Sequence, residues 1–150
     1  MEGDDPLKVS TKGRYGLRAI IDLILNSNGQ NVPLVTIAER QDISKNYLEQ
    51  VFSSLRNAGI VSSTKGAQGG YYLADKPSNI TVGDVLRVLE GDLSVVSSDL
   101  DIQENPIEDC IHRYVWDKVD SKVYEIIDGI TLEDLVNEYK DASNNFMYYI

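Results

Sequence analysis

Three polar side chains in the first third of the chain have the groups and the spacing needed to hydrogen-bond the edges of DNA bases. Asn46 and Gln50 are four residues apart, so a helix would place them on one face, with Glu49 beside them. Each amide can pair bidentately with adenine in the major groove, and the carboxylate can accept a hydrogen bond from cytosine N4. An ordinary solvated helix face is the alternative interpretation, and these residues alone do not decide between the two.

A predicted β-hairpin with a basic, glycine-rich tip follows directly and favours the DNA interpretation. Residues 60–64 and 71–73 have strand composition, and the sequence KGAQGG lies between them. The glycines would let the backbone approach a phosphate or enter a minor groove, and Lys65 would supply positive charge there. The tip lacks the Gly-Lys-Ser/Thr ending of a P-loop, so it does not indicate nucleotide binding. A plain surface hairpin is the alternative.

Two predicted helices would position the polar side chains. In the helix that begins after Ser44, apolar residues recur at helical spacing and define one buried face, and Gly59 ends it. A shorter helix over residues 34–41 precedes it, separated only by a tight connection. Two helices joined in this way, the second with a polar face and a hairpin behind it, are typical of a winged helix-turn-helix.

A further predicted helix, over residues 10–25, would bind phosphate at its start. Lys12 and Arg14 supply charge there, and the free amides of the first turn can hold an anion. Ser44 and Tyr47 are also assigned to phosphates. The full set of predicted DNA-contacting residues is Lys12, Arg14, Tyr15, Ser44, Lys45, Asn46, Tyr47, Glu49, Gln50, Lys65, Gly66, Gln68, Gly69 and Gly70.

The charge of the chain is divided unevenly between its two halves. Residues 1–80 hold nine Lys or Arg and eight Asp or Glu, whereas residues 81–150 hold five and sixteen, for a net charge of −10. The acidic half should face away from DNA, because it repels phosphate. The asymmetry permits DNA binding without proving it.

Composition indicates a soluble cytoplasmic protein with one core. The chain has 150 residues, 42% of them apolar, and no apolar run approaches the ~18 residues of a membrane span. The single cysteine, Cys110, excludes an internal disulfide and fits a reducing cytoplasm. Cys110 and His112 would point apart on a helix and have no further thiolate, so neither a metal nor another cofactor is predicted. No catalytic constellation is present, so the chain is not predicted to be an enzyme.

The acidic half is predicted to contain a dimerisation helix over residues 107–128. This helix could pack back on its own domain or pair with its counterpart in a second subunit. Pairing is favoured, because two-fold symmetry lets winged helices reach two half-sites. The predicted dimerisation residues are Ile111, Val115, Trp116, Val119, Val123, Ile126 and Ile127.

The predicted fold is therefore mainly α with a small β-hairpin, a winged helix-turn-helix domain followed by a long C-terminal dimerisation helix. The expected divisions are an unstructured or vector-derived start over residues 1–6, a DNA-binding domain over 7–91, a flexible linker over 92–106, the dimerisation helix with a following short helix over 107–140, and a tail over 141–150.

Four motifs resemble the Rrf-type family of bacterial winged-helix transcriptional regulators. They are Ser10–Gly16 (STKGRYG), Tyr47–Gln50 (YLEQ), Leu55–Gly59 (LRNAG) and Gly69–Tyr71 (GGY), and the likeness covers nearly the whole chain from Leu7. The resemblance implies a homodimer on a partly palindromic operator in double-stranded DNA. It also implies base contacts from Asn46, Glu49 and Gln50, with Lys65 in the minor groove.

One branch of this family holds an iron–sulfur cluster with three cysteines and a histidine. Only Cys110 matches that set, and Arg113 stands where the histidine would be, so no cluster is expected. The chain resembles the branch of cysteine-metabolism repressors more closely. Two features carry this resemblance, the sequence Arg87–Gly91 (RVLEG) and an aromatic tail ending in Tyr-Ile. Members of that branch act with cysteine synthase as a co-repressor.

The tail suggests how such a partner would be recognised. Ile150 would present an aliphatic side chain and a free carboxylate after Tyr148 and Tyr149, which suits capture in a partner's pocket. The similar partner enzyme grips the Ile-ending tail of serine acetyltransferase, which this tail could imitate. The alternative is that the aromatic residues pack on the dimer. Two other functions stay open: a redox-responsive regulator that senses through Cys110, and a protein-interaction adaptor that keeps the fold.

Overall fold

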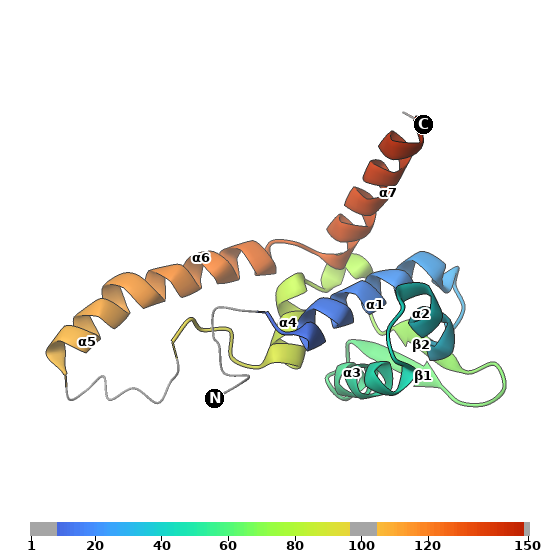
Figure 1. Cartoon of the computed structure of the whole chain (residues 1–150), viewed down its shortest axis with the longest axis horizontal. Helices are drawn as coiled ribbons and strands as arrows, with labels where there is room; N and C mark the ends of the chain where they lie inside the picture. The colour runs from blue at the N-terminus through green and yellow to red at the C-terminus, as the bar shows by residue number, and fades with distance from the viewer. Residues whose placement is uncertain (1–8, 97–104, 149–150) are drawn as a thin grey trace.

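The computed structural model describes residues 9–96 and 105–148, with side chains up to Asn145. Within these residues it is mainly helical with one two-stranded sheet, which confirms the predicted fold class (Figure 1). The elements in chain order are α1 (Thr11–Ser27), α2 (Leu34–Gln41), α3 (Lys45–Asn57), β1 (Val61–Thr64), β2 (Gly70–Leu73), the 3-10 turn η1 (Pro77–Asn79), α4 (Val82–Glu90), α5 (Pro106–Ile111), the π-helical turn η3 (His112–Trp116), α6 (Asp117–Asp128) and α7 (Leu132–Tyr148).

Helix α1 lies at the centre of the hydrophobic core. It packs against α2, α3, α4, β2 and the start of α7. Ile20 and Leu23 of α1 and Leu48 and Phe52 of α3 have no exposed surface. Burying an apolar side chain of this size contributes about 1.5–3 kcal/mol to stability. The contacts of α1 on several sides explain why apolar positions nearly encircle it.

The hairpin is attached to the helical part of the molecule through Tyr71 of β2. β1 and β2 pair antiparallel, with Thr64 opposite Gly70 at the tip end. Val32, just before α2, adds a third segment through two backbone hydrogen bonds of 2.9 Å with Tyr71. The ring of Tyr71 also meets Phe52 of α3 edge-on at 5.0 Å. The hairpin is therefore fixed relative to α3, as a wing must be.

The N-termini of α4 and α7 lie side by side and are capped in the same way. The hydroxyl of Thr81 accepts from Asp84 N and its amide donates to the Asp84 carboxylate, and Thr131 and Asp134 repeat this pair of bonds. An antiparallel bridge joins the two threonines. This arrangement brings Leu132, the first residue of α7, into the main core with no exposed surface.

Helices α5 and α6, with η3 between them, form one continuous arm, residues 106–128, which extends away from the core (Figure 1). A helix was predicted here, but its π-helical turn was not. The arm meets its own domain through polar groups. Val95 N donates to Asp120 Oδ1 at 2.8 Å, and Arg87 donates to both carboxylate oxygens of Asp128 at 2.6 and 2.9 Å. Residues 97–104 of the predicted linker lie outside the described residues.

The apolar stripe of the arm faces solvent within this chain. Asp120, Tyr124 and Asp128 are turned toward the domain, whereas more than half of the stripe residues are exposed to solvent. Four of the predicted dimerisation residues are exposed and three are half-buried: Ile111 (37%), Val115 (40%), Val119 (38%) and Ile126 (61%), then Trp116, Val123 and Ile127.

Helix α7 corrects the prediction for the end of the chain. A short helix followed by a tail from residue 141 was expected, but α7 has 17 residues and continues to Tyr148. Its first turns are held by Leu132 and Val136, which are buried, and its later turns project from the body of the molecule (Figure 1). Tyr149 and Ile150 of the predicted partner-binding tail lie outside the described residues, as does the side chain of Tyr148.

Candidate nucleic-acid interface

Helix α3 presents the predicted base-contacting residues on its exposed face. Ser44 caps the helix, because its hydroxyl accepts a hydrogen bond from Tyr47 N at 3.4 Å. The opposite face is buried, and this burial fixes which residues point outward. The exposed residues of the first two turns are Ser44, Lys45, Asn46, Glu49 and Gln50.

Lys45 and Glu49 form an ion pair across one turn of α3. Their nitrogen and oxygen atoms are 3.7 Å apart, and both side chains are more than half exposed. An exposed pair at this spacing contributes about 0.3–0.5 kcal/mol and is easily exchanged for another partner. Lys45 can therefore turn to a phosphate while Glu49 turns to a base.

Tyr47 and Tyr15 join α3 to α1. Their rings meet edge-on with centroids 6.3 Å apart, and the guanidinium of Arg18 lies 5.0 Å over Tyr15. Arg18 also donates to the backbone oxygen of Gln41 at 2.7 Å, at the end of α2. Partial burial raises the pKa of Tyr47, and the negative charge of Glu90 adds to this effect. A tyrosine phenol, whose ordinary pKa is about 10, is protonated at neutral pH with or without this shift, so Tyr47 has a hydroxyl that can donate to a phosphate oxygen.

The start of α1 departs from the prediction. Lys12 is half-buried and Arg14 exposed, but two amides at the start of α1 are not free. One carboxylate oxygen of Glu90, from the end of α4, accepts hydrogen bonds from Ser10 N at 2.9 Å and Gly13 N at 3.1 Å. The prediction that these amides hold a phosphate was wrong, because a carboxylate of the same chain already occupies them.

The tip of the hairpin keeps Lys65, Gly66 and Gln68 exposed. Gly66 has a φ of +106°, a conformation that other residues rarely adopt, and nothing surrounds it. Gly69 and Gly70 have a structural role that was not predicted. A side chain at Gly69 would collide with the backbone of Thr64, and one at Gly70 with the backbone of Val32. These two glycines permit close packing inside the protein.

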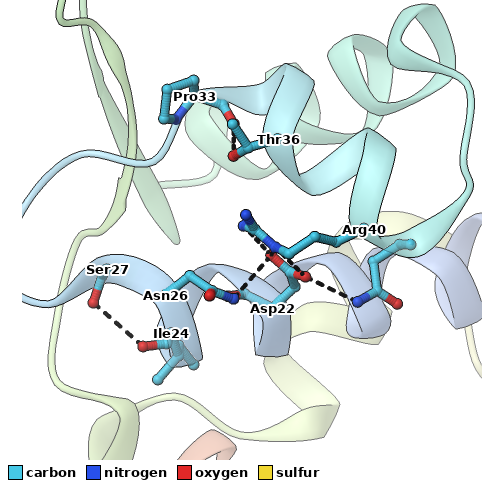
Figure 2. Close-up of polar contacts among 8 residues, drawn as sticks. Asp22, Ile24, Asn26, Ser27, Pro33, Thr36 and Arg40 are labelled. Atoms are coloured by element: carbon cyan, nitrogen blue, oxygen red, sulfur yellow. Dashed lines mark hydrogen bonds and ion pairs between the residues drawn. The ribbon is translucent and has the colours of Figure 1, made fainter.

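An ionic network around the buried Asp22, which the sequence analysis missed, holds α2 against α1 (Figure 2). Asp22 is only 4% exposed, and its carboxylate accepts from Arg40 Nε at 3.0 Å and Arg40 Nη2 at 2.6 Å. Gln41 Nε2 donates to it at 2.9 Å and Asn26 Nδ2 at 3.4 Å. The carboxylate in turn raises the pKa of Arg40 by hydrogen bonding. The only sequence signal for this site was an Asp within the apolar run of residues 19–25.

Arg56 is a second residue that the sequence analysis did not single out. Its Nη1 donates to Ser63 Oγ at 3.4 Å, which ties the last turn of α3 to β1. The helix then ends through Gly59, whose φ is +80°. The Arg56–Ser63 hydrogen bond and the turn at Gly59 thus help to fix the position of β1 relative to the end of α3.

A polar-faced helix in a bihelical unit, with a basic hairpin beside it, defines a winged helix-turn-helix protein. The family model "Rrf2: Iron-dependent Transcriptional regulator" matches residues 9–138. The chain belongs to the Rrf2 family, and it is a transcriptional regulator.

Individual relatives agree with this assignment. The HTH-type transcriptional regulator CymR of Bacillus subtilis is 42% identical over 96% of this chain and 100% of its own length. The HTH-type transcriptional regulator IscR of Aliivibrio salmonicida is 36% identical over 92% of this chain and 83% of its own. A solved structure described as CymR, the global cysteine regulator of B. subtilis, superposes with a TM-score of 0.74 at 45% identity over 88% of this chain and 98% of that one. These relatives are named as regulators, which confirms that the chain is not an enzyme.

The donor groups of this chain do not fit an iron–sulfur cluster. Cys110 is the single cysteine of the sequence and is exposed on α5. His112 Nδ1 lies 3.3 Å from Asp117 Oδ1. Across residues 9–96 and 105–148, no three His, Cys, Asp or Glu side chains come together as a metal site would require. None of the helices described above has the length and apolar composition needed to cross a bilayer.

Proposed function

We propose that this protein is a homodimeric repressor that binds a partly palindromic operator and controls genes of cysteine or sulfur metabolism. The observation that carries the DNA-binding part is the exposed polar face of α3 beside a wing that is fixed to the same helix. The cysteine-related part rests on similarity to the B. subtilis protein named as a global cysteine regulator.

The residues divide into base contacts and phosphate contacts. Asn46, Glu49 and Gln50 contact base edges in the major groove, because they project from the exposed face of a helix that fits that groove. Lys65 enters the adjacent minor groove, and Gly66 lets the tip follow it. The phosphate contacts come from Lys12, Arg14, Ser44, Lys45 and Tyr47.

The dimer forms through the arm. Ile111, Val115 and Val119 of its apolar stripe are exposed to solvent. The arm contacts its own domain through polar residues instead. A second copy of the same stripe is the surface that two-fold symmetry supplies. Such pairing would also place two copies of α3 on two half-sites, about one helical turn of DNA apart.

Cysteine synthase is the proposed partner enzyme. It would capture the C-terminal residues Tyr148, Tyr149 and Ile150 at the end of α7, which projects from the body of the molecule. Removing these three residues should abolish binding of cysteine synthase and leave operator binding unchanged. Full retention of the enzyme by the shortened chain would contradict this partnership.

Sequencing the genomic fragments that the protein selects tests the proposed function. The expected result is one partly palindromic motif near genes of cysteine or sulfur metabolism. Gln50→Ala should relax the base preference at one position of each half-site, at a cost of about 1–3 kcal/mol. Ser53→Ala, a change further along α3, is the control. Fragments with no shared motif would indicate the adaptor function instead.

A further inference from the structure

Glu90, the last residue of α4, closes the N-terminal end of α1. Its Oε1 atom accepts three hydrogen bonds, from Ser10 N at 2.9 Å, Ser10 Oγ at 2.7 Å and Gly13 N at 3.1 Å. Ser10 is the N-cap residue of α1, yet its hydroxyl makes no capping bond within the helix. The Glu90 carboxylate, from the other end of the DNA-binding domain, therefore caps α1 by accepting from Gly13 N.

Two glycines of the STKGRYG motif make this contact possible. A Cβ atom at Gly13 would collide with the Glu90 carboxylate, and one at Gly16 would collide with Leu89 on the same turn of α4. Both glycines are buried. The motif thus alternates between residues that allow α4 to approach and the basic residues Lys12 and Arg14.

The position of the first turn of α1 decides where the charges of Lys12 and Arg14 lie. These two residues flank Gly13, whose amide donates to Glu90. The first turn of a helix frays readily when its amides have no acceptor, because those groups lack partners within the helix. With the Glu90 oxygen in place, the turn is held against α4 and next to Tyr47, whose pKa the Glu90 charge helps to raise.

We propose that Glu90 is a positioning residue for DNA binding, which holds the first turn of α1 so that Lys12 and Arg14 meet the phosphate backbone. This inference rests on the proposed DNA-binding function. Glu90 itself does not contact DNA. A free carboxylate at this place would repel the phosphate backbone. The Glu90 carboxylate instead accepts three hydrogen bonds from its own chain, and it thereby holds the turn that carries Lys12 and Arg14.

The test is the salt dependence of operator binding by the full-length protein and its Glu90 variants. Each phosphate contact contributes about 0.9 to the slope of log K against log[salt]. Glu90→Ala should lower operator affinity about tenfold and reduce the slope by about 1–2, as the contacts of Lys12 and Arg14 are lost. Glu90→Gln should stay within about twofold of the original affinity, because its amide oxygen can still accept the same bonds.

Three further variants separate positioning from general stability. Arg87→Gln breaks the pair with Asp128 one turn earlier on α4 and should leave the slope unchanged. Glu90→Asp keeps the charge but withdraws the oxygen by one methylene, so its slope should fall whether or not the alanine variant folds. In a Lys12→Ala, Arg14→Ala background, Glu90→Ala should cost no further affinity.

Two results would overturn the inference while leaving the proposed function intact. One is an unchanged slope for both Glu90→Ala and Glu90→Asp. The other is tighter binding by Glu90→Gln, which would show that the carboxylate only repels phosphate. An unmodified protein that binds no operator at all would instead overturn the proposed function, and this inference with it.

Discussion

Phe52 on α3 and Val119 on the arm are both large apolar residues on helices, but Phe52 has no exposed surface and Val119 is 38% exposed. The DNA-contacting half places its apolar residues against α1, whereas α5 and α6 contain no buried residue at all. The first region is therefore complete within one chain. The arm contacts its own chain through polar residues and leaves four apolar residues exposed, which is the observation behind the proposed dimer.

Charge follows the same division. Residues 1–80 are nearly balanced, and residues 81–150 hold sixteen acidic side chains against five basic ones. Repulsion from phosphate would keep the arm off DNA while the half that contacts DNA approaches it. Recognition and assembly are thus assigned to different parts of the chain, and α4 connects them through Glu90 to α1 and through Arg87 to α6.

Leu132 follows the arm in sequence but belongs to the core of the DNA-contacting half, so its replacement should have the largest effect on stability. Leu132→Ala should lower the free energy of unfolding by about 2–5 kcal/mol, as expected for a fully buried leucine. Chemical denaturation measures the change, with Glu138→Ala on the exposed side of α7 as the control. A loss no larger than the control's would mean that α7 is not part of the core.

Val119 tests whether the arm needs a second copy. Val119→Asp should weaken dimerisation about 100-fold, or ~2.7 kcal/mol, because two-fold symmetry buries the new charge twice. Sedimentation over a range of concentrations measures the dimer dissociation constant. Ser121→Asp, at a polar exposed position of the arm, adds the same charge and should leave the dimer intact. Equal behaviour of both variants would rule out the stripe as the interface.

Asp22 tests whether its ionic network with Arg40 and Gln41 stabilises the DNA-contacting half. Asp22→Ala leaves Arg40 and Gln41 without their acceptor and should destabilise the fold by about 2 kcal/mol. This is less than the 3–5 kcal/mol of a fully buried pair, because the Arg40 side chain is 39% exposed. Thermal unfolding measures the loss. Asp22→Asn keeps one acceptor and should lose less; the reverse order would contradict the network.

Asp128 tests the link between the two regions through pH. Hydrogen bonds from Arg87 lower the pKa of Asp128 below its ordinary value. The contribution of the pair is therefore complete above the unfolded pKa of about 3.9 and is lost as pH falls through the lower folded pKa. Asp128→Asn should flatten the acid end of the stability curve, and Asp141→Asn should not. Identical curves for all three proteins would show that the pair does not stabilise the fold.

Cys110 should give the smallest effect. It is exposed on α5, and its replacement by serine should leave operator affinity unchanged in both oxidising and reducing buffer. Electrophoretic mobility shift with and without peroxide measures this. A response to peroxide that Cys110→Ser abolishes would favour the redox-responsive regulator.

Local patterns predicted the elements well, because their signals lie within a few residues. Ser44 and Gly59 mark the two ends of the helix around α3, and the predicted bounds of α2 match those of the structure. The exposed face of α3 followed from the spacing of its apolar residues alone. The likeness to Rrf-type regulators added the assignment of bases and grooves to these residues.

Contacts between distant positions could not be predicted in this way. Glu90 meets Ser10 and Gly13 across 80 and 77 residues, and nothing near Glu90 in sequence indicates that contact. The structural role of Gly70 was unpredictable for the same reason, because it depends on the backbone of the distant residue Val32. The length of α7 was missed because Lys140, Asp141, Asn144 and Asn145 are polar and exposed, so this part of the helix has no apolar periodicity.

The most direct test of the central claim is the affinity of the protein for its selected operator and for a scrambled sequence, measured at several salt concentrations. We expect the operator to be bound about 10³-fold or more tightly than the scrambled DNA, and log K to fall steeply and linearly with log[salt]. Lys65→Ala should reduce the steepness by about 1. Equal binding of both sequences with a flat salt dependence would contradict the claim that α3 and the wing recognise DNA.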